Sequence, residues 1–314
     1  TLNGCGVFAM RLDESVANGP FSAKLKANKS VFSFGEKIVC IGSDISAVDP
    51  DFPVQTTLFQ LALPNTEVPI HTAQSGAVKD FLFTGKAGKS LVHQQGSGYH
   101  VLLGNVDLQK SKQRSFKGEY SVNKALKNGI KPDDLPYTYG DFSAAWINHG
   151  LSPKDASYQY VIYPFMTKTD QLNFDQKIKD DHSFQVLQAD SNAHIVAYKP
   201  EKIIGYVLFN HKSFSGKEVL AKVSAPCIVM LQQKEADKIA VSVVQPDLNF
   251  PIDKKNKNLF ECFSKPTMFT LHLNGRWKVK TGGAKMQSSY TNNQTAVTLE
   301  CQHGFSQLIE LEKN

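Results

Sequence analysis

The sequence predicts an all-β protein in which two antiparallel β-sandwich regions are joined by one short helix. Its 314 residues suffice for about two domains, each with a hydrophobic core of its own. Residues typical of strands and turns are abundant, with 20 Phe, 10 Tyr, 21 Gly and 14 Pro. Short apolar or alternating runs recur along the chain, and about fifteen to twenty strands at this spacing are typical of antiparallel sandwiches.

In the first half of the chain, alternating or β-branched runs predict strands separated by turn residues. The runs are residues 7–12, 30–34, 37–42, 56–63, 99–103, 142–148 and 157–163. Gly35 and Glu36 lie between two of these runs. They predict a two-residue hairpin turn, because glycine at the first position supplies a positive φ.

One segment departs from the strand pattern. Thr167 precedes an acidic residue, Asp170, and apolar residues follow at Leu172, Phe174 and Ile178. A threonine cap, an acid in the first turn and apolar residues at this spacing predict a helix. This is the connecting helix of the predicted fold.

The helix also gives the predicted domain boundaries. We expect a large sandwich domain over residues 1–166, the connecting helix over 167–183 and a C-terminal sandwich domain over 184–314. In the C-terminal domain, the predicted strands are residues 184–188, 194–198, 203–209, 228–232, 239–244, 268–273, 296–301 and 305–311.

The composition excludes two classes of protein. Hydrophobic residues make up 41% of the chain and charged residues 20%, which is too apolar for an intrinsically disordered protein. No apolar run approaches the roughly 18 residues that a membrane-spanning helix needs, so no membrane partner is expected. The chain begins at Thr1 without an initiator methionine, and we expect it to be a fragment or a processed product of a longer protein.

The cysteines are expected to pack in the hydrophobic core, and their spacing predicts neither metal binding nor redox chemistry. There are 5 of them, and no Cys-x-x-Cys pair exists, which excludes a zinc knuckle and a thioredoxin-type pair. Cys40 and Cys227 lie in apolar runs, where we expect small buried thiols. None of the 9 histidines forms a His-x-x-x-His or His-Glu-x-x-His motif, so no metal site is predicted.

The net charge of +6 comes from lysine, since arginine occurs only as Arg11, Arg114 and Arg276. The densest basic stretch is residues 110–131, where Glu119 is the one acid. Its basic members are Lys110, Lys112, Arg114, Lys117, Lys124, Lys127 and Lys131. A polyanion could be drawn to this stretch, and a solvated loop without a ligand is the alternative. Nucleic acid is not an expected partner, because its readers usually combine arginine with aromatic residues.

Motifs for catalysis are incomplete. Phe83 stands where a phosphate loop ending at Ser90 would need glycine, and strand-like sequence follows it. His149, in the run 146–150, could act as a general base with Tyr158 or Tyr160 as the acid. The alternative is a strand end at which His149 is hydrogen-bonded near Trp146.

Six stretches in order along residues 6–249 carry a further signal. They are GVFAM at 6–10, residues 27–45, TTLFQ at 56–60, GDFSAAWINHG at 140–150 with PKDASYQY at 153–160, FQVL at 184–187 and VQPDLN at 244–249. Together these stretches resemble the C-terminal β-sandwich region of chondroitin sulfate ABC lyases. Those enzymes belong to polysaccharide lyase family 8, with the chondroitin AC and hyaluronate lyases. The resemblance implies an antiparallel super-sandwich followed by a smaller C-terminal β-sandwich.

The resemblance also implies a function. Such lyases cleave chondroitin or dermatan sulfate, and in some cases hyaluronate, by β-elimination to 4,5-unsaturated uronates. A helical toroid carries a catalytic His, Tyr and Arg, and a Glu comes from the start of the sandwich region. All four are expected upstream of Thr1, so no catalytic residue is expected in this chain, which alone should be inactive.

The role implied for this chain is a scaffold that forms one wall of the substrate cleft. At low salt, a sulfated glycosaminoglycan is expected to contact the basic residues Lys110, Lys112, Arg114 and Lys117. The other expected partner is the missing helical part of the same protein. No cofactor is expected to be required, dependence on a divalent cation is left open, and a secreted or periplasmic bacterial location is implied. The alternatives are a stand-alone carbohydrate-binding β-sandwich without catalysis and a passive structural domain.

Overall fold

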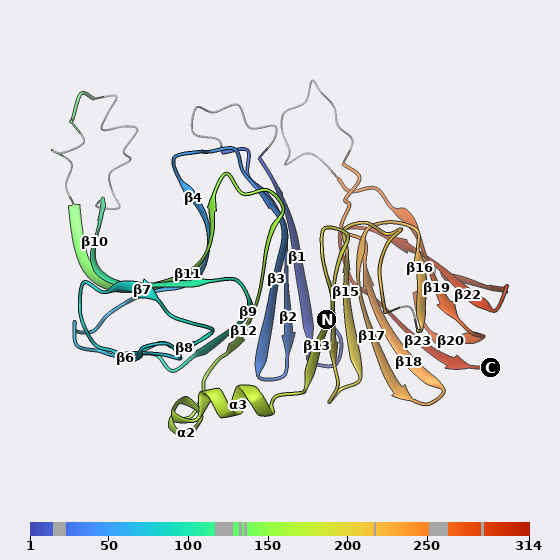
Figure 1. The fold of residues 1–314 in the computed structure, drawn as a ribbon. Coiled ribbons are helices and arrows are strands. Elements are labelled where there is room, and N and C mark those ends of the chain that lie inside the picture. The colour runs from blue at the N-terminus through green and yellow to red at the C-terminus, as the bar shows by residue number, and fades with distance from the viewer. Residues whose placement is uncertain are drawn as a thin grey trace. The chain divides into compact units, whose positions relative to one another are not determined.

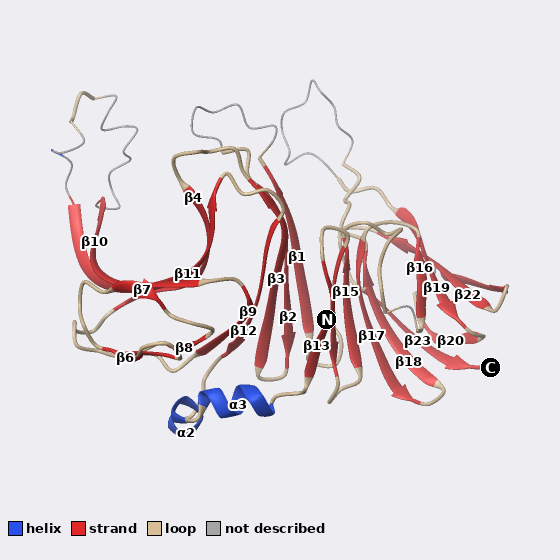
Figure 2. Cartoon of the chain, in the orientation of Figure 1, coloured by secondary structure: helices blue, strands red, loops and turns tan. Residues whose placement is uncertain are grey.

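The structure, a computed structural model, describes residues 1–14, 23–116, 128–131, 134, 137–216, 218–250, 263–283 and 286–314 (Figure 1). The described residues are dominated by strands, with two short helices (Figure 2). The chain divides into two compact units. Unit 1 comprises residues 1–48, 154–159 and 179–314, and unit 2 comprises residues 49–153 and 160–178.

Unit 2 contains one complete four-stranded sheet and a second set of four neighbouring strands. The first sheet has the order β4 (Pro53–Ala62), β11 (Tyr137–Leu151), β10 (Val106–Phe116) and β7 (Thr84–Lys86). The second set has the order β9 (Gly98–Leu103), β8 (Ser90–Val92), β5 (Ile70–Thr72) and β6 (Gly76–Val78). Pairing within both is antiparallel.

The core of unit 2 lies between these two groups of strands. Phe59 on β4 contacts Tyr99 on β9, with ring centroids 5.4 Å apart. The His93 ring lies 5.3 Å from Phe59 in an edge-on arrangement. Leu108 and Ala145 are fully buried on the paired strands β10 and β11. Alternation of buried and exposed residues along these strands gives each sheet one apolar face.

Unit 1 begins with β1 (Gly6–Asp13), β2 (Lys26–Phe34) and β3 (Lys37–Ser46), followed in the sheet order by β12 (Ala156–Tyr163), whose first residues belong to this unit. Gly35, with φ 55°, and Glu36 connect β2 to β3, which confirms the predicted turn. A side chain at Gly35 would also collide with the Tyr198 hydroxyl, which lies 2.7 Å from the position of a Cβ.

The rest of unit 1 is a two-sheet sandwich. A seven-stranded sheet has the order β13 (Phe184–Ala189), β14 (Ala193–Tyr198), β15 (Ile203–Leu208), β17 (Cys227–Glu235), β18 (Lys238–Val244), β23 (Gln307–Lys313) and β20 (Trp277–Thr281). A four-stranded sheet has the order β16 (Leu220–Val223), β19 (Thr267–Asn274), β22 (Gln294–Cys301) and β21 (Met286–Thr291).

One hydrophobic cluster fills the space between the two sheets of this sandwich. Ile195, Val229 and Val241 come from the seven-stranded sheet, and Phe269 and Leu271 come from the four-stranded sheet. Along β19 the inward positions alternate with less buried ones, as in a sandwich core. Strands β14, β17 and β18 also bury most of the intervening residues. Both the all-β fold class and the C-terminal β-sandwich are therefore confirmed. Cys40 and Cys227 are buried free thiols, as predicted.

The connecting helix is present but interrupted. Helix α2 (Lys168–Leu172) and helix α3 (Phe174–Asp180) replace the one continuous helix that the sequence predicted. Thr167 is the N-cap, and its hydroxyl accepts a hydrogen bond from the Asp170 backbone N–H at 3.1 Å. Asn173 interrupts the helix because its φ of −108° and ψ of 25° are not helical, and asparagine readily bonds locally to the backbone.

Two further differences from the sequence expectations concern the strands and the division of the chain. The described residues contain strands β1 to β23, more than expected, because short strands such as β5 to β8 carry too few residues to show a pattern. The compact units also divide the chain differently from the predicted domains, since residues 1–48 group with the C-terminal part. The boundaries at 166 and 183 stay a prediction. None of the described helices is long and apolar enough to cross a membrane.

Candidate functional site

The basic stretch predicted from the sequence begins in strand β10, where a loop was the alternative. Residues 106–116 pair with β11 along their whole length. β7 pairs with residues 107–109 of β10, and β4 pairs with β11 only from Phe142 onward. Residues 112–116 and 137–141 therefore continue as a two-stranded extension, which we call the ribbon (Figure 1). Lys117, Lys124 and Lys127 lie outside the described residues.

Lys110 stands at the base of the ribbon and is fully buried. Its ammonium group donates hydrogen bonds to three backbone carbonyls, at 3.0 Å to Thr66, 2.9 Å to Val68 and 2.6 Å to Lys79. Burial lowers the pKa of Lys110, and the nearby carboxylate of Asp80 opposes that shift. An ammonium has three donors, and all three are used.

The prediction that Lys110 belongs to a substrate-binding surface is therefore wrong. The strand period places this side chain on the inner face of the sheet, where it joins two connections of unit 2. A dense run of lysines in the sequence does not distinguish a buried lysine from an exposed one, because alternate residues of a strand point to opposite faces and burial also changes along one face.

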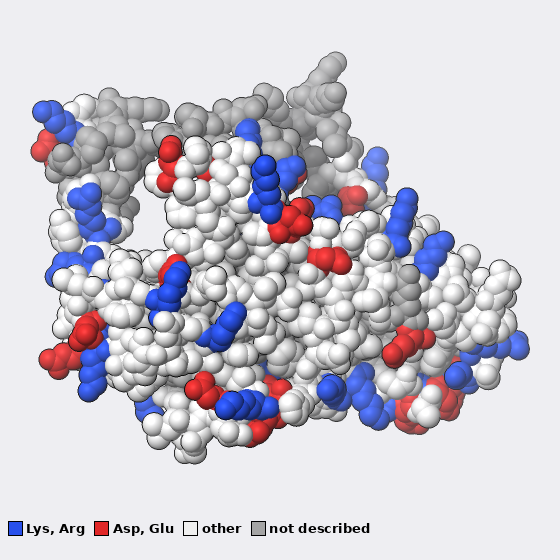
Figure 3. All heavy atoms as spheres, viewed as in Figure 1, with Lys and Arg blue, Asp and Glu red and all other residues white. Residues whose placement is uncertain are grey.

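Beyond Lys110, the same face of the ribbon becomes exposed. Lys112 is opposite Asp141 in the register, with an Nζ–Oδ1 distance of 3.6 Å. Arg114 is opposite Tyr139, and its guanidinium lies 4.6 Å from the centroid of the Tyr137 ring. Directly opposed residues share one face of an antiparallel pair. Lys and Arg side chains are visible over this part of the molecule in Figure 3.

Sequence reasoning missed the two tyrosines of this face. Tyr139 is 64% exposed, and its ring centroid lies 6.5 Å from that of Tyr137. The Tyr-x-Tyr alternation at 137–139 is the signal that could have found them, because period two in a strand puts both rings on one face. An exposed ring beside two cations suits a ligand with an apolar sugar face and anionic substituents.

The residues considered for acid–base chemistry have structural partners. The His149 Nε2 lies 2.9 Å from the Thr56 hydroxyl of the neighbouring strand β4. Tyr160 is buried, and Tyr158 is buried against Gly42, where a Cβ would lie 2.1 Å from its ring. Burial raises the pKa of Tyr158 well above its usual range, so this phenol is a poor proton donor at neutral pH. His149 therefore fits the alternative interpretation, in which it lies near the end of a strand and forms a structural hydrogen bond. Its partner in that bond is Thr56.

A second buried polar centre lies in unit 1. The His194 Nε2 is 2.8 Å from the Ser43 hydroxyl, and its Nδ1 is 2.7 Å from the Ser30 hydroxyl. Ser43 donates its own proton to the Asp190 carbonyl at 2.8 Å, so it accepts a hydrogen bond from His194 Nε2–H. Ser30 then donates to the unprotonated Nδ1. Burial lowers the pKa of His194 to about 4. His194 is fully buried, which makes this network structural.

Metal ligands do not converge in the part of the chain that the structure describes. No group of three or more His, Cys, Asp and Glu side chains there is placed to hold a metal ion.

Two family models match most of the chain. The model for the super-sandwich domain of polysaccharide lyase family 8 matches residues 1–174. The model for the C-terminal beta-sandwich domain of the same family matches residues 185–249.

Curated relatives align over nearly the whole chain. A chondroitin sulfate ABC exolyase of Bacteroides thetaiotaomicron is 30% identical over 98% of this chain, which covers 30% of the relative. A chondroitin sulfate ABC endolyase of Proteus vulgaris is 28% identical over 93% of this chain and 26% of the relative. The chain thus spans less than a third of the length of these relatives.

Solved structures share the fold. A Paenibacillus xanthan lyase covers 100% of this chain with a TM-score of 0.73 and 16% identity, over 28% of its own length. A Streptomyces coelicolor chondroitin AC lyase, solved in complex with chondroitin sulphate, gives a TM-score of 0.68 at 14% identity, over 35% of its own length. At this identity, the likeness establishes the fold and leaves the site residues to be argued from this chain.

Proposed function

The chain belongs to polysaccharide lyase family 8, and from this membership we propose that it is the C-terminal part of a glycosaminoglycan lyase. The whole protein would cleave chondroitin or dermatan sulfate by β-elimination and leave a 4,5-unsaturated uronate. The support is the match of two successive domains of the family, in their order, to residues 1–174 and 185–249. The names of the relatives supply the proposed substrates.

In this proposal the chain binds and positions the polymer but performs no chemistry. β-Elimination needs a group that neutralises the uronate carboxylate, a base for the C5 proton and an acid for the leaving oxygen. We place these groups in the missing portion, which accounts for more than two thirds of the length of the relatives.

The ribbon is the surface that we assign to the polymer. Arg114 and Lys112 supply positive charge, and Tyr139 supplies an exposed ring on the same face. Arginine can hold a sulfate or a carboxylate by two parallel hydrogen bonds, while an aromatic ring packs on the apolar face of a sugar. Because the cations are exposed, salt should weaken their contribution over a Debye length of about 8 Å at physiological ionic strength.

The test uses the full-length parent protein with chondroitin sulfate and dermatan sulfate at low salt, followed by the ultraviolet absorbance of the unsaturated product. We expect the parent to release product, and Arg114→Gln to raise KM several-fold with little change in kcat. Lys199→Gln is the matched control, because Lys199 is an exposed cation outside the ribbon. Absence of product from the parent would refute the lyase assignment, and an unchanged KM in Arg114→Gln would remove the ribbon from it.

A stand-alone carbohydrate-binding module is the second candidate, and the exposed Tyr139 beside Arg114 is the observation that favours it. The same experiment separates the two functions. Saturable binding of the polymer by a parent protein that releases no unsaturated product would favour the binding module.

A further inference from the structure

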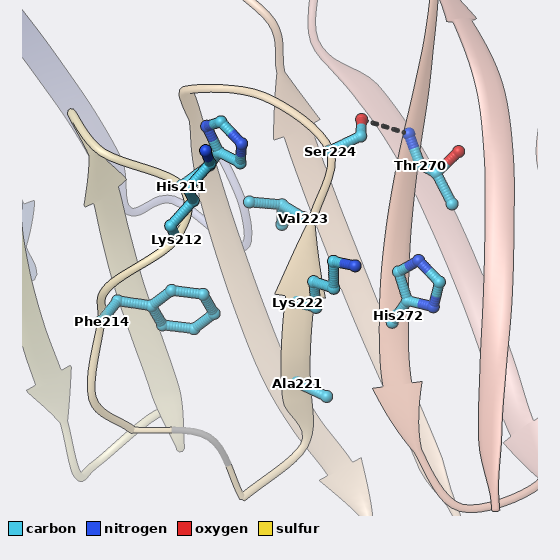
Figure 4. A pocket seen from close by; sticks show the side chains of 9 residues that line it. All are labelled: His211, Lys212, Phe214, Ala221, Lys222, Val223, Ser224, Thr270 and His272. Atoms are coloured by element: carbon cyan, nitrogen blue, oxygen red, sulfur yellow. Dashed lines mark hydrogen bonds between the residues drawn. The ribbon is translucent and has the colours of Figure 1, made fainter. Parts of the chain in front are cut away.

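The C-terminal sandwich carries a pocket of about 730 Å³ beside its edge strand β16 (Figure 4). The segment that follows β15 forms one side of this pocket, and strands β16 and β19 form the other. Four basic side chains contribute to its lining, namely His211, Lys212, Lys222 and His272. No acidic residue is among the nine that line it. We call it the β16 pocket.

The strand register brings two of these basic residues together. Lys222 on β16 is opposite His272 on β19, and in Figure 4 the Lys222 side chain extends toward the imidazole. Burial and, secondarily, the charge of Lys222 both lower the pKa of His272. Within the described residues, neither Lys212 nor Lys222 has an ion-pair partner. Among the described residues that line it, the pocket therefore gathers lysine charge without a carboxylate to offset it.

A fixed hydroxyl lies beside the cations. The Ser224 Oγ accepts a hydrogen bond from the Thr270 backbone N–H at 2.9 Å, and the Ser224 N–H donates to the Thr270 carbonyl at 2.9 Å. The hydroxyl oxygen is thus held in place while its proton remains available for an acceptor.

One wall of the β16 pocket is apolar and rigid. Phe214 is buried and packs edge-on against Tyr206, with centroids 6.2 Å apart and an interplanar angle of 83°. The Tyr206 hydroxyl in turn donates to the Gly216 carbonyl at 2.8 Å. A pocket that combines cations, a hydroxyl donor and an aromatic wall matches a sugar ring that carries an anionic substituent.

We propose that the β16 pocket binds an anionic saccharide unit, with Lys222 and His272 holding its sulfate ester or carboxylate and the wall at Phe214 contacting its ring. The choice of a glycosaminoglycan as the ligand rests on the proposed function. The pocket would be a second binding site for the polymer, located in the C-terminal sandwich and containing no residue of the ribbon.

The experiment is a calorimetric titration of the 314-residue chain with a chondroitin sulfate oligosaccharide at low salt. Because the variant loses a charge-assisted hydrogen bond to the anion, we expect Lys222→Gln to weaken binding about tenfold. We expect a smaller loss for His272→Gln. Lys222 is exposed, so its replacement should leave the fold intact. Lys199→Gln removes the same charge from the same unit outside the pocket and should leave the affinity unchanged.

Two further measurements identify the anionic group and locate it. Desulfated chondroitin and inorganic sulfate serve as separate titrants, and a preference for the sulfated sugar over desulfated chondroitin assigns the cations to the ester. The pKa of His272, followed by NMR, should rise when the oligosaccharide binds, because an anion offsets the charges that face the imidazole. The titratable groups that face the imidazole are Lys222 on β16 and His211 and Lys212 on the opposite wall, while β22 places Ala296 opposite His272.

The inference is overturned if Lys222→Gln binds the oligosaccharide as tightly as the wild type, or if Lys199→Gln loses as much affinity as Lys222→Gln. An unchanged pKa of His272 at saturation would also overturn it. Its failure is separable from failure of the lyase assignment. The parent protein would still release unsaturated product if only the β16 pocket were misassigned.

Discussion

The ribbon of unit 2 and the β16 pocket of unit 1 both present cations, but the chain assembles them in opposite ways. Along β10, Lys110 at the base of the ribbon is buried, while Lys112 and Arg114 in the ribbon, two and four residues further on, are exposed. In the pocket, Lys222 and His272 are far apart in sequence and become neighbours through strand register. The density of charge along a sequence therefore says less about a binding surface than the pairing of strands does.

The largest expected effect tests whether Lys110 is structural. Lys110→Met removes the ammonium that donates to three backbone carbonyls, and losing a hydrogen bond to a charged group costs about 1.5–3 kcal/mol. Allowing for partial relaxation, we expect a loss of about 3–4 kcal/mol in the free energy of unfolding, measured with denaturant. Lys112→Met, two residues away on the exposed part of the strand, should change it by less than about 0.5 kcal/mol. Equal losses would contradict the contrast between these lysines.

The next effect concerns His194, the buried counterpart of the pocket histidine His272. Its pKa is about 4 in the folded chain and about 6.5 when unfolded. The unfolded state therefore binds more protons between these values, and stability is complete above about pH 6.5 and falls as the pH drops toward 4. The expected loss is about 3 kcal/mol. Denaturant unfolding from pH 7 to pH 4.5 measures it, and His194→Gln should flatten the profile. A profile that keeps its slope in this variant would place the titration elsewhere.

A smaller effect sharpens the role of the ribbon. Tyr139→Ala removes a ring that is largely exposed, so the unfolding free energy should hardly change. An aromatic contact worth about 1 kcal/mol predicts a severalfold rise in the KM of the parent protein that persists at high salt. The rise caused by Arg114→Gln should instead shrink as salt is added. The same salt response for both variants would contradict separate stacking and charge contributions.

The smallest effect tests a feature that is local in sequence. Thr167→Ala removes the N-cap of α2 and its bond to the Asp170 backbone. Cap removal typically costs about 1 kcal/mol, which thermal unfolding should detect as a lower Tm. Thr167→Ser keeps the hydroxyl and is the control. A Tm of Thr167→Ala equal to that of the control would show that the cap contributes nothing.

These cases explain what could be predicted from the sequence. The Thr167 cap, the Gly35 turn and the alternating strands depend on neighbouring residues, and all of them are present in the structure. The sequence left open whether β10 is a strand or a loop, because residues 109–115, which follow Leu108, are all polar and show no alternation with apolar residues. The burial of Lys110 depends on carbonyls from two distant connections, and the pairing of Lys222 with His272 depends on sheet register. Neither leaves a local pattern in the chain.

We infer that this chain binds an anionic saccharide and performs no elimination by itself. One titration of the 314-residue chain with chondroitin sulfate, followed by heat and by ultraviolet absorbance in the same sample, tests it most directly. We expect saturable heat and a flat absorbance. A rise in absorbance from the chain alone would contradict it and return attention to His149 and Thr56, and a titration without heat at several temperatures would show that these surfaces do not bind the polymer.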